Sequence, residues 1–163
     1  SGAKPIAEVC GFGHANDAQH PTAGRADAST AARAVLGALE NSGRRASEVD
    51  YVCAHGNGSR LFDRLETMAL KEALGARAFE IPISSIKGQI GHCTYAAGSI
   101  AAYATVEMMV ASRVSPTVGL IDRDPECDLD FVSGAGRPAH INFAILNAFG
   151  FGGQNASLVL RKV

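Results

Sequence analysis

Short apolar runs alternate with amphipathic stretches along this chain. The apolar runs are rich in Val and Ile and are bounded by Gly, Pro or polar residues, which is typical of buried strands. The last two runs are separated by a glycine-rich loop and are expected to form a hairpin. The predicted strands are residues 5–13, 49–54 and 81–86, a short extended segment at 114–118, and the pair 141–146 and 155–160.

Two amphipathic helices are predicted between these strands. Apolar residues at i, i+3 and i+4 spacing predict a first helix that Ser29 or Thr30 could cap and that runs to about Asn41, with Gly43 ending it. The same spacing predicts a second helix over residues 60–74. Its expected inward side chains are Leu61, Leu65, Met68, Ala69 and Ala73, and Gly75 is its stop signal.

A third helix, over residues 95–112, is apolar on almost every side. Such a helix is expected to be buried nearly all round, and this chain has few layers with which to cover it. We therefore expect a large apolar face that another polypeptide covers. Polar stretches at 14–27 and 121–130 are predicted loops. The order of strands and helices predicts an α/β fold with a mixed sheet.

Composition and charge exclude several classes of protein. The 163 residues are enough for one domain that buries roughly 70% of its unfolded surface. The net charge of −1, without a basic cluster, argues against nucleic-acid binding. No apolar run is long enough for a membrane span, and the start lacks the pattern of a signal peptide. Four widely spaced cysteines are typical of reduced thiols in a cytoplasmic protein, and no zinc site is expected.

Three glycine-containing segments carry the candidate chemistry. They contain two imidazoles and one ammonium group, those of His55, His92 and Lys87, each in a turn after an apolar run. Taken singly, a histidine at the end of a strand is most often a hydrogen-bonded structural residue. Together, the segments predict one site assembled from separated pieces, without an evident nucleophile. They span residues 51–59, 84–92 and 147–153.

These segments resemble the C-terminal half of a β-ketoacyl synthase (ketosynthase) of the thiolase-fold superfamily. The resemblance covers essentially residues 1–163, and it implies the second half of a duplicated, five-layered α/β/α/β/α fold. The N-terminal half, which carries the nucleophilic cysteine, is absent from this chain. The matching motifs are Ala54-His55-Gly56, Ser84-Ser85-x-Lys87, Gly91-His92, Asp124-Pro125-Glu126-Cys127-Asp128 and Asn147-x-Phe149-Gly150-Phe151-Gly152-Gly153.

The resemblance also implies a reaction: acyl transfer to the cysteine, then decarboxylative Claisen condensation with malonyl-acyl carrier protein. His55 and His92 would stabilise the enolate oxygen, because a neutral imidazole can donate one N–H. Lys87 would place a positive charge beside His92. It would be paired with the carboxylate of Glu66, with Asp63 in support.

Further roles follow from the same resemblance. Thr22, Asn57 and Ser59 match positions that bind the pantetheine arm, although Asn57 and Ser59 stand where threonine is usual, and ordinary turn chemistry is an equal explanation. Phe151 matches a gate to the acyl pocket, and its backbone N–H would contribute to a second oxyanion hole. Phe149 is expected to line the substrate site. Aromatic residues between glycines can also simply pack a loop.

Three positions depart from the family pattern. Cys53, Ala101 and Leu146 stand where asparagine, glutamate and serine form a polar network behind the site, in some members around a monovalent cation. Small apolar groups in their place predict that no metal is bound. Among the cysteines, only Cys93, next to His92, is worth testing as a substitute nucleophile.

Three functions of different classes remain open. The leading one is half of a condensing enzyme, with no bound cofactor, that uses acyl carrier protein as its partner and forms a homodimer or heterodimer. The second is a non-catalytic subunit resembling a chain-length factor, although such subunits usually lose the histidine pair. The third is a domain that only docks acyl carrier protein through basic residues. The candidate docking residues are Arg25, Arg44, Arg45, Arg60 and Arg64.

Overall fold

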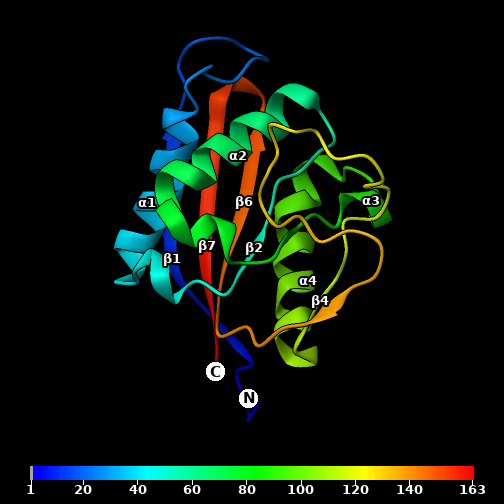
Figure 1. Cartoon of the computed structure of the whole chain (residues 1–163). Coiled ribbons are helices and arrows are strands. Elements are labelled where there is room, and N and C mark those ends of the chain that lie inside the picture. The colour runs from blue at the N-terminus through cyan, green and yellow to red at the C-terminus, as the bar shows by residue number, and fades with distance from the viewer. Residues whose placement is uncertain (1) are drawn as a thin grey trace.

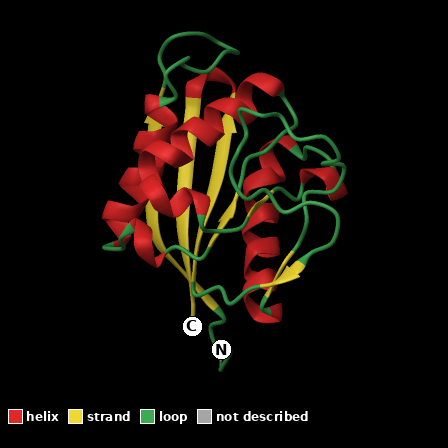
Figure 2. Cartoon of the chain, viewed as in Figure 1, coloured by secondary structure: helices red, strands yellow, loops and turns green. Residues whose placement is uncertain are grey.

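The computed structural model describes residues 2–163 and contains a mixed sheet with helices on both faces (Figures 1 and 2). The predicted α/β class with a mixed sheet is therefore confirmed. The elements are β1 (Ala7–Asn16), α1 (Ser29–Ser42), β2 (Tyr51–Cys53), α2 (Arg60–Leu74), β3 (Ile83–Ser84), α3 (Lys87–Ile90), α4 (Ala97–Ala111), β4 (Arg113–Val114), β5 (Arg137–Pro138), β6 (Phe143–Gly150) and β7 (Gln154–Lys162).

The main sheet has the strand order β1-β7-β6-β2-β3. β1, β7 and β6 pair antiparallel, and β6, β2 and β3 pair parallel. The predicted hairpin is confirmed as β6 and β7, both longer than expected, so that residues 147–150 of the predicted third loop belong to β6. β1 likewise extends to Asn16, into a stretch that was predicted as loop.

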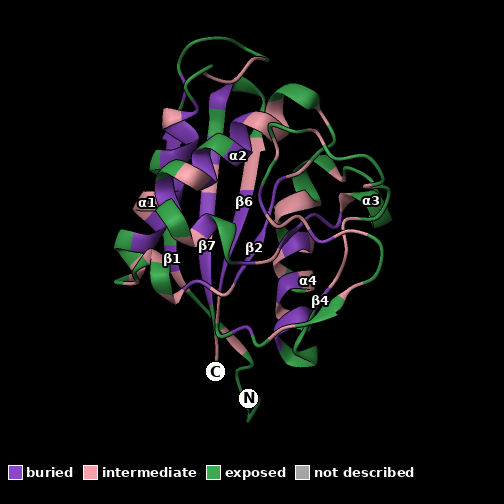
Figure 3. Cartoon of the chain, viewed as in Figure 1, coloured by how far each residue is buried: buried purple, intermediate pink, exposed green. Residues whose placement is uncertain are grey.

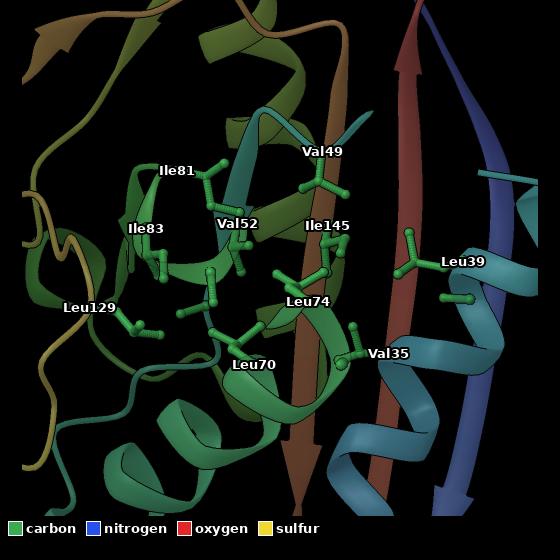
Figure 4. Packing of buried hydrophobic residues seen from close by; sticks show 14 of the residues in the cluster. Val35, Leu39, Val49, Val52, Leu70, Leu74, Ile81, Ile83, Leu129 and Ile145 are labelled. Carbon is green, nitrogen blue, oxygen red and sulfur yellow. The ribbon is translucent and has the colours of Figure 1, made fainter. Parts of the chain in front are cut away.

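Side chains that alternate between the two faces of the sheet form one hydrophobic core on each face. Val52 and Ile145 point toward α1 and α2, where they pack with Leu70 (Figure 4). Their neighbours Cys53 and Leu146 belong to a second cluster, which includes the buried residues of α4. Since side chains of a strand alternate between faces, this is the arrangement expected for a sheet covered on both sides.

α1 lies directly on β1. A Cβ atom added at Gly13 would stand 2.0 Å from the carbonyl oxygen of Ala34, so the close approach of the two backbones requires glycine there. The prediction that Ser29 or Thr30 caps this helix is wrong: both lie within it. Instead the carboxylate of Asp27 accepts hydrogen bonds from the backbone N–H and the hydroxyl of Ser29. Gly43 ends the helix in a left-handed conformation, as predicted.

α2 has the predicted bounds, and three of its five predicted inward side chains, Leu65, Ala69 and Ala73, are buried. Leu61 and Met68 were expected inside and are 49% and 45% exposed. Leu70 and Leu74 are buried instead, together with Glu66. The carboxylate of Glu66 accepts hydrogen bonds from the backbone that follows β2.

α4 is covered on one face alone. The prediction that this helix is buried all round is wrong within this chain, since Tyr103 is 67% and Val110 is 53% exposed (Figure 3). The predicted start at residue 95 is a 3-10 turn, Thr94–Ala96, before the helix proper. The open apolar face agrees with the expectation of an uncovered surface. The buried residues of α4 are Ala101, Thr105, Met108 and Met109.

Two smaller differences concern short strands. β3 is two residues long, although 81–86 was predicted as a strand, and β4 pairs with β5, a strand that the sequence pattern did not indicate. Residues 121–130 form a loop, as predicted. Within residues 2–163, no helix combines the length and hydropathy needed to cross a membrane.

Candidate active site

His55, Lys87 and the end of β6 meet at one edge of the sheet. β2, β3 and β6 run parallel, so their carboxyl ends lie together. The ring centroids of His55 and His92 are 5.5 Å apart in an edge-to-face arrangement, and the rings of His55 and Phe149 are 5.9 Å apart. The prediction that three separated segments form one cluster is confirmed by this geometry.

The imidazole of His55 is held in one tautomer. Its Nδ1 accepts a hydrogen bond from the backbone N–H of Phe149 at 3.2 Å, which leaves the proton on Nε2. The side chain is nearly fully buried, and burial lowers the pKa of His55 to about 3, with Lys87 and His92 adding to the effect. His55 is therefore neutral at neutral pH and presents Nε2–H as a donor.

His92 has the same hydrogen-bond arrangement in an exposed position. Its Nδ1 accepts from the backbone N–H of Thr94 at 3.1 Å, so its Nε2 also carries the proton. Thr94 has φ 45°, in the left-handed region that a β-branched residue rarely adopts. This strained residue lies in the turn whose N–H holds the ring of His92.

Glu66 fixes the main chain around His55. One carboxylate oxygen accepts from the backbone N–H of His55 at 2.8 Å and from the side-chain amide of Asn147 at 3.0 Å. The other accepts from the backbone N–H of Gly56 at 2.8 Å. Burial raises the pKa of Glu66, while these three donors oppose the rise. Sequence reasoning assigned no role to Asn147, although this residue opens the last motif of the family resemblance.

Lys87 does not pair with a carboxylate, contrary to prediction. Its ammonium group donates to the backbone carbonyl oxygen of His55, and among the described residues it forms no ion pair with Glu66 or Asp63. Three N–H donors hold the carboxylate of Glu66 instead. Burial lowers the pKa of Lys87, although the negative charge of Glu66 acts in the opposite direction. The hydroxyl of Ser85 donates to the carbonyl oxygen of Gly56 at 2.8 Å and completes this turn.

Two cavities adjoin Glu66. The larger one, of about 560 Å³, is lined by Asn57, Lys87 and His92 and by the loop at 117–131. A much smaller one, of about 20 Å³, lies beside Thr22 and Phe149. The candidate substrate-binding residues are thus divided between two adjoining cavities. Ser59 lines neither of them; it precedes the first residue of α2.

Phe151 lies at the tip between β6 and β7 and is 75% exposed. The tip is attached to the loop after β1, since the N–H of Gly152 donates to the carbonyl oxygen of Pro21 at 2.6 Å. Gly153 has φ 75°, and a Cβ atom there would lie 2.7 Å from the Cβ atom of Asp17. Glycine is therefore required beside Phe151, whereas the aromatic ring itself projects away from the protein.

The three departures from the family pattern lie in one apolar cluster. Cys53 and Leu146 of the sheet are buried in the same cluster as Ala101 of α4, so apolar packing occupies the place where the family has a polar network. The described residues contain no group of three or more His, Cys, Asp or Glu side chains placed to hold a metal ion. Burial raises the pKa of the Cys53 thiol, which makes it a weak nucleophile. Cys93, beside His92, is partly exposed.

Most of the candidate docking arginines are engaged with carboxylates of this chain. Arg25 pairs with Asp27, and Arg64 pairs with Asp124 at 2.9 Å. Arg44 and Arg45 both pair with Glu48. These contacts leave little free positive charge for a docking surface made of the five arginines.

Comparison with known proteins places these observations in a family. Residues 6–120 match the family described as beta-ketoacyl synthase, C-terminal domain. The chain is 42% identical over 161 residues to 3-oxoacyl-[acyl-carrier-protein] synthase 2 of Synechocystis, covering 99% of this chain and 39% of that protein. It is 38% identical to the tetracenomycin polyketide synthase ketoacyl synthase alpha subunit of Streptomyces glaucescens, with 99% and 38% covered. The chain thus spans about two fifths of the length of these relatives.

Solved structures agree with the sequence matches. A type II polyketide synthase ketosynthase, in complex with its acyl carrier protein and bound to the hexaketide, superimposes with a TM-score of 0.96 at 36% identity, over 99% of this chain and 40% of that chain. A β-ketoacyl synthase from Burkholderia phymatum gives a TM-score of 0.92 at 39% identity, over 99% and 39%. The thiolase-like fold is therefore shared with these proteins, and the chain belongs to the beta-ketoacyl synthases as their C-terminal domain.

Proposed function

We propose that this chain is the C-terminal half of a β-ketoacyl-[acyl-carrier-protein] synthase that carries out decarboxylative Claisen condensation in fatty acid or polyketide synthesis. The observation that carries the proposal is the imidazole pair of His55 and His92. Their rings are 5.5 Å apart, and each Nδ1 accepts a backbone N–H. Two neutral N–H donors can therefore point at one oxygen atom, which is what an enolate requires.

The reaction uses these donors at a defined step. The bond between C2 of the malonyl group and its carboxylate breaks, carbon dioxide leaves, and the electron pair moves to the thioester oxygen. The Nε2–H groups of His55 and His92 stabilise the charge on that oxygen, and donors preorganised in this way are usually the largest catalytic contribution. C2 then attacks the acyl carbonyl carbon, and the thiolate of the cysteine in the N-terminal half departs.

Lys87 and Glu66 support this step through the backbone of His55. Lys87 donates to the carbonyl oxygen of His55, and Glu66 accepts from the N–H of the same residue. Both the N–H and the carbonyl group of the His55 backbone are thereby fixed, and the ring is positioned through them. Lys87 also brings positive potential to the larger cavity, which His92 lines as well.

The substrate arm would enter through the larger cavity. Asn57 lines it beside His92, and Thr22 and Phe149 line the small cavity that adjoins it at Glu66. We assign Thr22, Asn57 and Ser59 to the phosphopantetheine arm of acyl carrier protein. Phe149 would contact the acyl chain, and Phe151, exposed at its glycine-flanked tip, would be the gate. A relative of known structure binds its acyl carrier protein, which supports this partner.

The missing half of the enzyme would cover α4. Tyr103 and Val110 expose an apolar face that water would otherwise contact, and the chain spans about two fifths of the relatives it matches. An N-terminal half that carries the cysteine is the occupant we propose, and complete synthases would pair as dimers. A double substitution, Y103S/V110S, should leave the chain folded and weaken its association with that half.

The test is the reaction of the protein purified from its native host together with any polypeptide bound to it. With malonyl-acyl carrier protein as substrate, release of carbon dioxide should fall by about 100-fold or more in H55A and in H92A, because each removes one donor. H140A, which removes an exposed histidine outside the site, is the matched control. Full carbon dioxide release by both H55A and H92A would refute the proposal.

The alternative function is a non-catalytic subunit resembling a chain-length factor. Two similar structures are complexes of a ketosynthase with its chain length factor, at TM-scores of 0.93 and 0.85. In that case the partner would contain the complete site, and H55A and H92A would leave carbon dioxide release unchanged while altering the length of the product. The two histidines and their fixed tautomers favour the enzyme.

A further inference from the structure

Two side chains of the β6–β7 hairpin connect to Glu66 through buried hydrogen bonds. Asn147 in β6 and Ser157 in β7 lie directly opposite each other in the strand register. The hydroxyl of Ser157 donates to Oδ1 of Asn147 at 2.8 Å, and Nδ2 of Asn147 donates to Glu66 at 3.0 Å. All three side chains are at most 2% exposed, so no water competes for these bonds.

Ser157 determines which way the amide of Asn147 points. An amide has one acceptor oxygen and one donor nitrogen, and the hydroxyl of Ser157 satisfies the oxygen. The nitrogen then faces the carboxylate of Glu66. With the amide reversed, its oxygen would face the carboxylate oxygen without a proton between them, and that arrangement is unfavourable in a buried site.

The orientation of Glu66 in turn determines the backbone around His55. The carboxylate oxygen that accepts from Asn147 also accepts from the N–H of His55, and the second oxygen accepts from the N–H of Gly56. β6 contributes again two residues later, where the N–H of Phe149 holds Nδ1 of the His55 ring. The backbone and the ring of His55 are therefore both aligned by the same strand.

We propose that Asn147 and Ser157 are positioning residues, which hold Glu66 in the orientation that aligns His55 for the decarboxylation step. This inference rests on the proposed function. Both side chains are at most 2% exposed and lie behind the carboxylate of Glu66, so neither is placed to touch the substrate. Both act through Glu66 on the direction of the His55 Nε2–H bond.

The experiment compares S157A with S157T, which keeps the hydroxyl, in the protein purified with its bound polypeptide. S157A should lower kcat for malonyl decarboxylation about tenfold, because a small misalignment of a donor is costly. KM should change less than about twofold, since the substrate contacts are intact. S157T should keep kcat near the wild-type value. T67A is the matched control: it removes another fully buried hydroxyl, which donates to the backbone of α2 and stands outside this hydrogen-bond chain.

A second measurement separates this inference from the proposed function. The NMR shifts of the His55 backbone amide and ring nitrogens should move in S157A and N147L and stay in place in S157T and T67A. If the wild-type protein releases no carbon dioxide, the proposed function fails, and these shifts still decide whether Ser157 aligns His55. Unchanged shifts in a folded S157A, or an unchanged kcat in an active protein, would overturn the inference.

Discussion

The buried imidazole of His55 should make the stability of this protein depend on pH in a way that one substitution removes. Burial lowers its pKa to about 3 in the folded protein, whereas an unfolded chain has the ordinary value near 6.5. H55N removes the titrating ring. The Oδ1 atom of asparagine can still accept the N–H of Phe149, so the variant keeps the contact that fixes the hairpin.

The sign and size of the effect follow from the two pKa values. Between about pH 6.5 and pH 3 the unfolded state binds a proton at this residue and the folded state does not, so stability falls as pH decreases. The slope approaches about 1.4 kcal/mol per pH unit. Between pH 7 and pH 5 the wild type should lose about 2 kcal/mol more than H55N does.

Urea unfolding of both proteins at pH 7, 6 and 5 measures this difference. Comparing the two curves cancels the other titrating groups, including Glu66, whose pKa burial shifts upward. H140N removes an exposed histidine and keeps the histidine count equal to that of H55N. The error of such fits is below about 0.5 kcal/mol. The reasoning would be refuted if the difference in free energy of unfolding between wild type and H55N changed by less than about 0.5 kcal/mol from pH 7 to pH 5.

Three further substitutions test other parts of the structure. E66A leaves two buried N–H donors and one partly buried N–H donor without an acceptor and should cost about 3 kcal/mol or more in urea unfolding. A loss below about 1 kcal/mol would mean that water replaces the carboxylate. G153A should lower the free energy of unfolding by about 2–3 kcal/mol because its Cβ atom would meet Asp17; G58A has a similar φ, open space around it and an expected cost of about 1 kcal/mol, so equal losses would contradict the argument. L146S should cost about 3–5 kcal/mol by leaving a cavity and a hydroxyl in the apolar cluster; a smaller loss that potassium ions enhance would instead indicate a cation site.

Much of the fold could be predicted because it depends on local patterns. The helix at 60–74 has apolar residues at helical spacing and a glycine stop, and the hairpin has two apolar runs around glycines. The burial of individual side chains was predicted less well. Leu61 and Met68 match the spacing of an inward stripe but are exposed, and no periodicity reports the hydrogen bonds that bury Glu66. The exposed face of α4 likewise has no signal in the apolar pattern of its own sequence.

The site could be predicted as a set of residues but not as a set of bonds. Glycine-containing turns and histidines were visible in the sequence, and their meeting at one edge follows from parallel strands. The partner of Lys87 could not be predicted, because a backbone carbonyl has no sequence signature. Ser157 was equally hidden: a serine in a strand is ordinary, and only the register with Asn147 gives it a neighbour.

The pairing of the first strand with the last has a consequence for the order of folding. Ala7 lies opposite Lys162, so β1 cannot complete its ladder until residues near 162 have been synthesised. α1 can form early. The strand that it covers, β1, lies at the edge of the sheet as the structure describes it and pairs there with β7. Contacts between such distant residues slow folding, because a long loop must close before they are made. Until β7 is synthesised, β1 would have no partner strand, and its exposed apolar residues Val9 and Phe12 would be open to contact with other chains. The growing chain would depend most on chaperones at this stage.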